Sequence, residues 1–273
     1  MSVLKGTSAL VTGGGSGIGR ACAARLAADG AEVTIIGRTE SRLQNVAKEI
    51  GCRYFAADVT DEEQIAAAVA FAAEAAPLRS VVASAGGSTS IGPIRELDAA
   101  AWRETLELNA TGTLLTFKHA AIAMTSGGGT SGAGTSGGGT GGALVAISSI
   151  ASSNTHRWFG AYGPSKAAVD NLVALAADEL GPHGVRVNGI RPGLVATELV
   201  AGITQEGPVL EDYLACMPIS RVGRPEDIAD AAAFLVGPGS TWITGTVLNV
   251  DGGHHLRRGP DYSSLFGEMF GAL

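Results

Sequence analysis

Short apolar runs alternate with longer, alanine-rich segments along most of the chain. Seven of these runs are typical of buried strands, and they cover residues 8–11, 32–36, 52–56, 80–83, 143–147, 185–190 and 246–250. Helical patterns lie between them and include residues 20–28, 62–75, 99–124, 161–180 and 225–236. Strands that alternate with helices predict a parallel sheet with helices on both faces. We therefore predict an α/β fold, a doubly wound seven-stranded parallel sheet that residues 1–273 form as a single domain.

One segment, residues 126–142, departs from this pattern. Its seventeen residues are Gly, Ser, Thr and a single Ala, a composition that behaves as a flexible coil and buries no core. Because it lies between a predicted helix and a predicted strand, we expect a loop within the domain. We favour an inert expansion of the surface; a mobile flap or a partner contact is the alternative. Residues 254–273 follow the last predicted strand and are expected to form a C-terminal tail.

The charge balance narrows the range of partners. The formal net charge is −7, which argues against nucleic acid and against an anionic membrane surface. The apolar runs end well short of a membrane span, and no charged-then-apolar leader opens the chain. We therefore expect a cytoplasmic protein. Only 16% of the residues are charged, so part of the helix surface should be buried in the core or against other subunits.

Neither the cysteines nor the adjacent histidines predict a metal site. Cys22, Cys52 and Cys216 are scattered and lack Cys-x-x-Cys spacing, which argues against a zinc site and against a disulfide framework. His254 and His255 are neighbours whose side chains point in different directions, and no carboxylate or cysteine completes a ligand set. We predict no metal.

The first glycine-rich turn has the sequence context of a dinucleotide-binding turn. Residues 12–19 read Thr-Gly-Gly-Gly-Ser-Gly-Ile-Gly, directly after the first predicted strand and before the first predicted helix. Glycines let backbone amides approach a pyrophosphate, and the helix N-terminus adds a partial positive charge. A glycine turn without a ligand is the alternative interpretation.

A second motif places a phenol and an ammonium group on one helix face. Tyr162 and Lys166 are four residues apart, so both side chains project from the same side of a helix. A free phenol titrates near pH ~10 and is a poor proton donor or acceptor at neutrality. A nearby ammonium group in a partly dry cleft is expected to lower that pKa. Pro164 is compatible with this helix if it lies in the first turn.

Together the two motifs resemble the short-chain dehydrogenase/reductase family, and the likeness covers nearly the whole chain. Further matches are Asn109 in Leu-Asn-Ala-Thr-Gly, Ser149 thirteen residues before the tyrosine, Pro192-Gly193 after the sixth strand, and the final Asn-Val-Asp-Gly-Gly of residues 249–253. One departure is Ser84-Ala85-Gly86, where the family usually has Asn-Ala-Gly, and we expect altered loop stability rather than lost activity.

This resemblance implies a Rossmann fold and assigns roles to individual residues. Four residues are expected to be catalytic, namely Asn109, Ser149, Tyr162 and Lys166. The residues expected to bind the cofactor are Gly13, Ser16, Gly17, Ile18, Gly19, Arg38, Thr39, Asp58, Val59, Ala85, Gly86, Tyr162, Lys166, Pro192, Gly193, Val195 and Thr197. The resemblance also implies a homo-oligomer, a tetramer or a dimer.

The end of the second strand indicates which cofactor is used. An acidic side chain there would bind the adenosine ribose hydroxyls and repel a 2′-phosphate. This chain has Arg38 and Thr39 instead, and Arg38 can pair with a 2′-phosphate through charge-assisted hydrogen bonds. We predict NADP(H); NAD(H) is possible if Arg38 only stacks on the adenine.

The expected activity is reversible hydride transfer between a nicotinamide cofactor and a carbonyl or alcohol carbon. His156, Trp158 and Tyr213 are candidate substrate contacts, and residues 196–221 carry apolar side chains that suggest a hydrophobic pocket. The leading hypothesis is an NADP(H)-dependent oxidoreductase for a small or medium hydrophobic carbonyl or secondary alcohol. The alternatives are a 3-oxoacyl carrier-protein reductase-like enzyme and a non-catalytic, NADP-sensing regulatory protein.

Overall fold

A computed structural model describes residues 3–126, 141–259, 262 and 264–265. Its centre is one parallel sheet of seven strands in the order β3-β2-β1-β4-β5-β6-β7. The strands are β1 (Ser8–Thr12), β2 (Glu32–Gly37), β3 (Arg53–Ala56), β4 (Leu78–Ala83), β5 (Gly142–Ile147), β6 (Val185–Pro192) and β7 (Val247–Val250). The chain order reverses between β1 and β4, and in open sheets of this kind ligands bind beside the carboxyl ends at that point.

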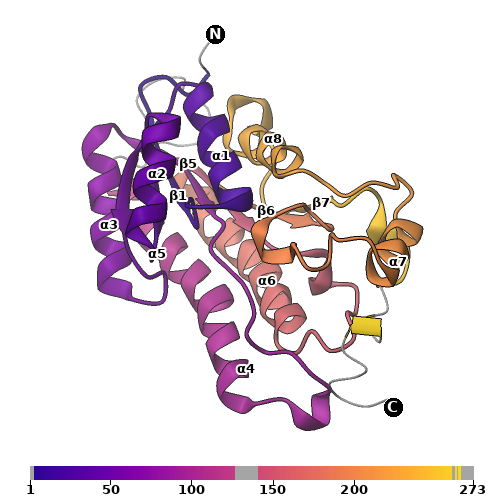
Figure 1. Ribbon diagram of the computed structural model, residues 1–273. Coiled ribbons are helices and arrows are strands. Elements are labelled where there is room, and N and C mark those ends of the chain that lie inside the picture. Colours follow the sequence, from indigo (N-terminus) through magenta and orange to yellow (C-terminus); the bar gives the residue numbers. More distant parts are fainter. Residues whose placement is uncertain (1–2, 127–140, 260–261, 263, 266–273) are drawn as a thin grey trace.

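Helices cover both faces of this sheet (Figure 1). They are α1 (Gly17–Ala28), α2 (Glu40–Ile50), α3 (Glu62–Ala75), α4 (Ala99–Leu106), α5 (Gly112–Thr125), α6 (Tyr162–Leu180), α7 (Pro208–Cys216) and α8 (Pro225–Val236). Helices α1, α2 and α8 bury apolar side chains against one face, and α3, α5 and α6 bury theirs against the other. The predicted doubly wound α/β fold is confirmed.

The strand predictions agree with the structure to within two residues at each end, because the central strands are apolar runs buried between the helices, such as β1, β4 and β5. Two helices, α2 and α7, are not among those predicted. The predicted helix over residues 99–124 is divided, since a π-helical turn, Glu107–Thr111, separates α4 from α5. The Gly-rich loop predicted over residues 126–142 lies, apart from its ends, outside the described residues.

A third apolar cluster lies beyond the end of the sheet, around α7. It contains six buried residues, Trp158, Leu194, Val209, Tyr213, Met217 and Tyr262. Figure 1 shows α7 beside the C-terminal part of the chain, away from the helices that cover the sheet. This cluster forms one wall of the region into which the strands β4, β5 and β6 open.

Candidate active site

The turn after β1 is shaped by glycines that no other residue could replace without movement. Gly13 has a φ of 66°, in the left-handed region. A Cβ atom at Gly19 would lie 2.3 Å from the Gly13 carbonyl oxygen, so α1 packs directly against the turn. This close approach leaves the backbone at the start of α1 open to a ligand, as a pyrophosphate site requires.

The buried Thr12 side chain joins the ends of β1 and β4. Its Oγ1 accepts hydrogen bonds from the backbone amides of Ser84, at 3.0 Å, and Ala85, at 2.9 Å. These bonds hold the Ser84-Ala85-Gly86 loop against the glycine turn. The backbone amide of Ser84 therefore has a hydrogen-bond partner that does not depend on the side chain at position 84.

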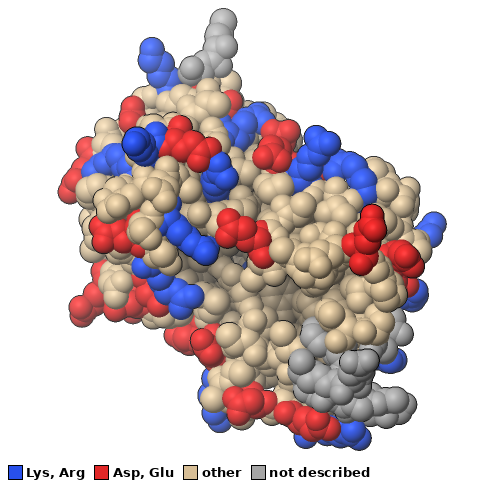
Figure 2. Space-filling view, in the orientation of Figure 1, with Lys and Arg blue, Asp and Glu red and all other residues tan. Residues whose placement is uncertain are grey.

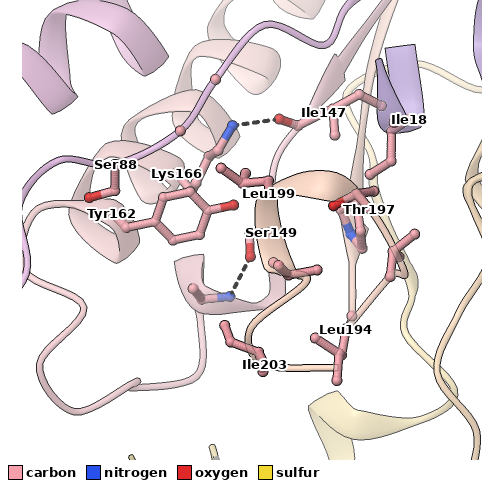
Figure 3. A pocket seen from close by; sticks show the side chains of 18 of the residues that line it. Ile18, Ser88, Ile147, Ser149, Tyr162, Lys166, Leu194, Thr197, Leu199 and Ile203 are labelled. Atoms are coloured by element: carbon pink, nitrogen blue, oxygen red, sulfur yellow. Dashed lines mark hydrogen bonds between the residues drawn. The ribbon is translucent and has the colours of Figure 1, made fainter. Parts of the chain in front are cut away.

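A cleft of about 500 Å³ opens at this end of the sheet (Figure 3). Residues from the ends of β1, β4, β5 and β6 meet in it, and the apolar side chains that Figure 3 labels around it include Ile18, Leu194 and Leu199. Of the predicted catalytic and cofactor-binding residues, fourteen line the cleft: Gly13, Ser16, Gly17, Ile18, Gly19, Ala85, Gly86, Ser149, Tyr162, Lys166, Pro192, Gly193, Val195 and Thr197.

Tyr162 and Ser149 lie side by side in the cleft, with the Tyr162 hydroxyl turned toward Ser149 (Figure 3). Tyr162 begins α6, and Ser149 precedes the short helical turn Ile150–Ser152. The Ser149 Oγ accepts a hydrogen bond from the Ala151 amide at 3.1 Å, so its own proton remains available for donation. Burial raises the pKa of Tyr162, and hydrogen bonding with the Ser149 hydroxyl opposes that shift.

Lys166 is buried one turn further along α6. Its Nζ donates a hydrogen bond to the Ile147 backbone oxygen at 2.8 Å and lies 5.8 Å from the centre of the Tyr162 ring. Burial lowers the pKa of Lys166 to about 8, and the negative charge of Asp170 acts in the opposite direction. The ammonium group therefore still carries its charge in most molecules at pH 7.

The sequence predicted that Lys166 lowers the pKa of Tyr162, and in this structure the pKa of Tyr162 is raised. The physical reason is that burial of the phenol outweighs the stabilising contacts, and that Lys166 is directed toward Ile147 rather than toward the phenol oxygen.

Asn109 lies on the π-helical turn and is fully buried. Its side-chain oxygen accepts from the Gly87 amide at 3.0 Å, and its side-chain nitrogen donates to the Gly87 oxygen and to Ser165 Oγ, each at 2.8 Å. These bonds tie the loop after β4 to α6. Asn109 thus lies next to Lys166, because a Cβ atom at Gly86 would come within 3.0 Å of both.

Four predicted cofactor contacts lie outside the lining of this cleft, at the β2 and β3 side of the sheet. Arg38 and Thr39 are exposed directly after β2, where Thr39 caps α2. Asp58 accepts hydrogen bonds from Thr60, and Val59 is buried under α5, where its side chain contacts Gly112. All four lie on loops at the carboxyl ends of β2 and β3, the side on which the cleft opens.

The residues present fit a nicotinamide dinucleotide. The glycine turn and the start of α1 line the cleft, and their close packing leaves no space for Cβ atoms at Gly13 and Gly19. Arg38 supplies a cation on the side where the second strand ends. The other end of the same cleft carries the Tyr162 phenol, the Ser149 hydroxyl and the Lys166 ammonium group. This arrangement can hold an extended anionic ligand at one end and exchange a proton at the other.

The three predicted substrate contacts separate into two groups. His156 and Tyr213 line the cleft, and burial lowers the pKa of His156, which keeps the ring neutral at pH 7. Trp158 does not line it: its side chain is buried in the cluster around α7, and its backbone has a φ of 70°. Trp158 is therefore a packing residue in this structure, and its assignment as a substrate contact is corrected.

The sequence did not single out several residues that line the cleft. Ile91, Phe159 and Leu265 are apolar lining residues from three separate segments. Phe159 lies between Ser149 and Tyr162, a position that could have drawn attention to it. Ile91 and Leu265 carry no local signal, because only the tertiary fold brings their segments to the cleft.

No group of three or more His, Cys, Asp or Glu side chains among the described residues could hold a metal ion. His255 is instead paired with Asp251 at 2.9 Å. Within the described part of the chain, no helix combines the length and the apolar character that crossing a membrane requires.

Comparison with known proteins identifies relatives over nearly the whole chain. The model of the family described as "Enoyl-(Acyl carrier protein) reductase" matches residues 13–255. Cis-4-hydroxycyclohexanecarboxylate dehydrogenase of Sinomonas cyclohexanicum is 38% identical over 252 residues, which cover 90% of this chain and 95% of the relative. Galactitol 2-dehydrogenase (L-tagatose-forming) of Cereibacter sphaeroides is 37% identical over 256 residues, with 92% and 96% covered.

Solved structures show the same relationship. A short-chain type dehydrogenase/reductase from Mycobacterium ulcerans is 48% identical and superposes with a TM-score of 0.92, covering 98% of this chain and 96% of the other. A short-chain dehydrogenase from Burkholderia cenocepacia J2315, solved with NADP, is 33% identical with a TM-score of 0.79, covering 92% and 99%. A 7α-hydroxysteroid dehydrogenase complexed with NADH is 32% identical with a TM-score of 0.82, covering 92% and 95%.

Proposed function

This chain belongs to the short-chain dehydrogenase/reductase family, and we propose that it uses NADP(H) to interconvert a carbonyl group and a secondary alcohol on a small or medium hydrophobic substrate. As a family member it is an oxidoreductase that acts on CH–OH groups. The observation that carries the proposal is the meeting of Tyr162, Ser149 and Lys166 in one cleft with the glycine turn after β1.

The cofactor supplies the hydride chemistry, and the protein supplies proton transfer and orientation. Tyr162 donates a proton to the substrate oxygen in reduction and accepts one from the alcohol in oxidation. Ser149 donates a hydrogen bond to the same oxygen, where negative charge develops. This role agrees with the Ser149 oxygen accepting from the Ala151 amide, which leaves the hydroxyl proton for donation.

Lys166 and Asn109 support this centre from behind. One N–H group of Lys166 is held by the Ile147 oxygen, and its remaining N–H groups can bind the nicotinamide ribose hydroxyls. Asn109 keeps the loop after β4 in place through its two bonds to Gly87. By likeness to the family, Asn109 also supports a water-linked proton path from Lys166 toward solvent.

The preference for NADP(H) rests on the loop after β2. Arg38 is exposed there, no acidic residue lies between the end of β2 and Glu40, and Thr39 adds a hydroxyl. A guanidinium group is well suited to pair with a 2′-phosphate. Similar solved structures contain NADP in one case and NADH in another, so the residues of this chain, rather than its family, support the preference.

The apolar character of the cleft supports a hydrophobic substrate. Leu194, Leu199 and Ile203 surround the mouth in Figure 3, and Glu198, an acidic lining residue, pairs with Arg42 at 3.4 Å. Relatives are named for hydroxycyclohexanecarboxylate and for galactitol, which differ widely in polarity. The apolar lining of this cleft favours a hydrocarbon ring over a polyol chain.

A 3-oxoacyl carrier-protein reductase-like enzyme is the second candidate, because the matching family model is described as an acyl carrier protein reductase. Carrier proteins are acidic, so their docking requires a basic surface beside the cleft. Figure 2 shows acidic and basic side chains interspersed on this face, around a hollow lined by uncharged residues. This surface favours free small molecules over a carrier-bound substrate.

One assay series tests the proposed function against both alternatives. Oxidation of NADPH and NADH is followed with a panel of neutral ketones and with an acetoacetyl carrier protein, and cofactor binding is measured without substrate. We expect turnover of neutral ketones, with higher catalytic efficiency for NADPH. Preferred turnover of the carrier-bound substrate would support the reductase-like alternative, and cofactor binding without any turnover would support the sensing protein.

Exposed apolar side chains suggest that the chain forms a homo-oligomer, a dimer or a tetramer. Leu114 and Ile122 on α5 and Leu175 on α6 are about half exposed, and Trp242 near β7 is 98% exposed. Large exposed apolar residues on neighbouring elements are typical of subunit interfaces. Sedimentation equilibrium measures the mass directly, and a monomer at micromolar concentration would contradict this proposal.

A further inference from the structure

The C-terminal segment is attached to α7 by several polar contacts. Arg258 Nη1 donates to Asp212 on α7 at 2.9 Å, and a second contact makes the ion pair bidentate. Arg257 donates to the Ala215 backbone oxygen at 3.0 Å, and Asn154 donates to the Arg257 oxygen at 2.9 Å. The segment is thus tied both to α7 and to the loop that follows Ser149.

Tyr262 lies in this segment and is completely buried. Its hydroxyl is hydrogen-bonded to that of Tyr213 on α7, and its ring lies 4.8 Å from the ring of Phe159 and 5.9 Å from that of Tyr213. Tyr213 and Phe159 both line the cleft, whereas Tyr262 lies behind them. The position of the two lining rings therefore depends on Tyr262.

The same wall faces Tyr162. The ring of Phe159 lies 5.8 Å from the Tyr162 ring in an edge-on arrangement, and His156 lies between Phe159 and Tyr213, 5.8 Å and 6.3 Å from their rings. Burial keeps His156 neutral at pH 7. A substrate whose oxygen reaches Tyr162 must therefore place the rest of its body against an uncharged, largely aromatic wall.

We propose that Tyr262 is a positioning residue that sets the upper size limit of the substrate, by holding Tyr213 and Phe159 in the cleft wall. The substrate class is a compact, uncharged ketone or secondary alcohol of about one ring. This inference rests on the proposed function for its reaction. The cleft of about 500 Å³ must also receive the nicotinamide end of the cofactor, which leaves room for a compact substrate only.

The test compares cyclohexanone with the bicyclic ketone 2-decalone. Tyr262→Ala should raise the ratio of kcat/KM for 2-decalone over cyclohexanone at least about tenfold, since one or more methylene groups in an apolar pocket change discrimination by about 10- to 200-fold. Tyr262→Phe keeps the ring and should stay within about threefold of the wild-type ratio. Leu256→Ala, at a residue of the same segment that is 71% exposed, is the matched control and should leave the ratio unchanged.

Binding measurements separate this inference from the proposed function. Calorimetric titration of cyclohexanone and 2-decalone into protein saturated with the oxidised cofactor reads the size limit without turnover, because this complex contains no hydride donor. If the wild type turns over neither ketone, but Tyr262→Ala changes the binding selectivity as expected, the proposed function alone is overturned. A Tyr262→Ala ratio equal to that of the wild type, or no binding of either ketone, would overturn the size limit. Cofactor affinity checks folding, and Tyr262→Leu replaces the alanine variant if that variant does not fold.

Discussion

Lys166 donates a hydrogen bond from its Nζ to the backbone oxygen of Ile147, 2.8 Å away. This contact holds the ammonium group at the end of β5, where it is buried and where its pKa falls to about 8. Lys166 is therefore held by the fold beside the Tyr162 ring, with one of its N–H groups engaged by the Ile147 oxygen.

This burial predicts a pH-dependent stability. An unfolded lysine keeps its proton up to about pH 10.4, whereas folded Lys166 releases it near pH 8, so the unfolded state binds more protons between these values. Stability therefore rises with pH across this window. The free energy of unfolding of the wild type, relative to Lys166→Met, should increase by up to about 3 kcal/mol in total.

Urea unfolding of both proteins between pH 7.5 and 9.5 measures the rising part of that difference. The highest pH, 9.5, is chosen so that the phenol of Tyr162, whose pKa is raised, does not titrate in the measured range. The same substitution at the exposed Lys48 of α2 is the control for removing a lysine. A wild-type advantage that falls as the pH rises would contradict the burial of a charged Lys166.

Removing the Tyr162 hydroxyl should separate chemistry from binding. Tyr162→Phe is expected to reduce kcat by roughly 10²- to 10⁴-fold, because the substrate oxygen loses its proton donor, while the dissociation constant of the cofactor changes little. Stopped-flow turnover and cofactor fluorescence measure the two quantities. Tyr54→Phe removes a phenol that contacts Gln44 away from the cleft and should leave kcat unchanged. Full activity of the Tyr162 variant would exclude this residue as the proton donor.

Arg38 should determine the cofactor preference. A charge-assisted hydrogen bond contributes about 1.5–3 kcal/mol, so Arg38→Ala should lower the ratio of kcat/KM with NADPH to that with NADH by about 10- to 100-fold. Steady-state kinetics with both cofactors measure this ratio. Arg95→Ala, at an exposed arginine paired with Glu96, is the control. If NADH is preferred by the wild type and the Arg38 variant behaves identically, the NADP(H) assignment is wrong.

The glycine turn should not accept a methyl group at position 19. In Gly19→Ala the new Cβ would lie 2.3 Å from the Gly13 backbone oxygen, so the turn must move and the cofactor should bind at least about tenfold more weakly, a change of 1.4 kcal/mol. Gly181→Ala is the matched control, because its Cβ meets nothing within 4 Å. Isothermal titration with NADPH compares the two variants, and equal affinities would show that the turn does not hold the cofactor.

The sequence predicted the sheet well because buried parallel strands are continuous apolar runs, such as residues 143–147. It also predicted that Tyr162, Lys166 and Ser149 lie together, since helix geometry places the first two on one face. It did not predict the π-helical turn around Asn109, because hydrophobic periodicity does not distinguish that turn from an α-helix. Trp158 was wrongly placed in the substrate site, because a position between two catalytic residues does not reveal which way a left-handed backbone directs its side chain.

The contributions of Tyr262 and Leu265 could not be predicted for a different reason. Both lie close to the end of the chain, outside any strand or predicted helix; Leu265 lines the cleft, and Tyr262 lies behind its wall in contact with Tyr213 of α7. Such contacts depend on the completed tertiary structure. The sequence therefore predicted the catalytic side chains of the site better than the side chains that form the walls of the substrate pocket.

The absence of a side chain at Gly86 has its own consequence for the catalytic groups. A single methyl group at this position would approach Asn109 Oδ1 to 2.7 Å and Lys166 Nζ to 3.0 Å. Three separate parts of the chain therefore share one small volume that only a hydrogen atom leaves open. Even an alanine at position 86 would therefore displace the Asn109 amide and the Lys166 amine together.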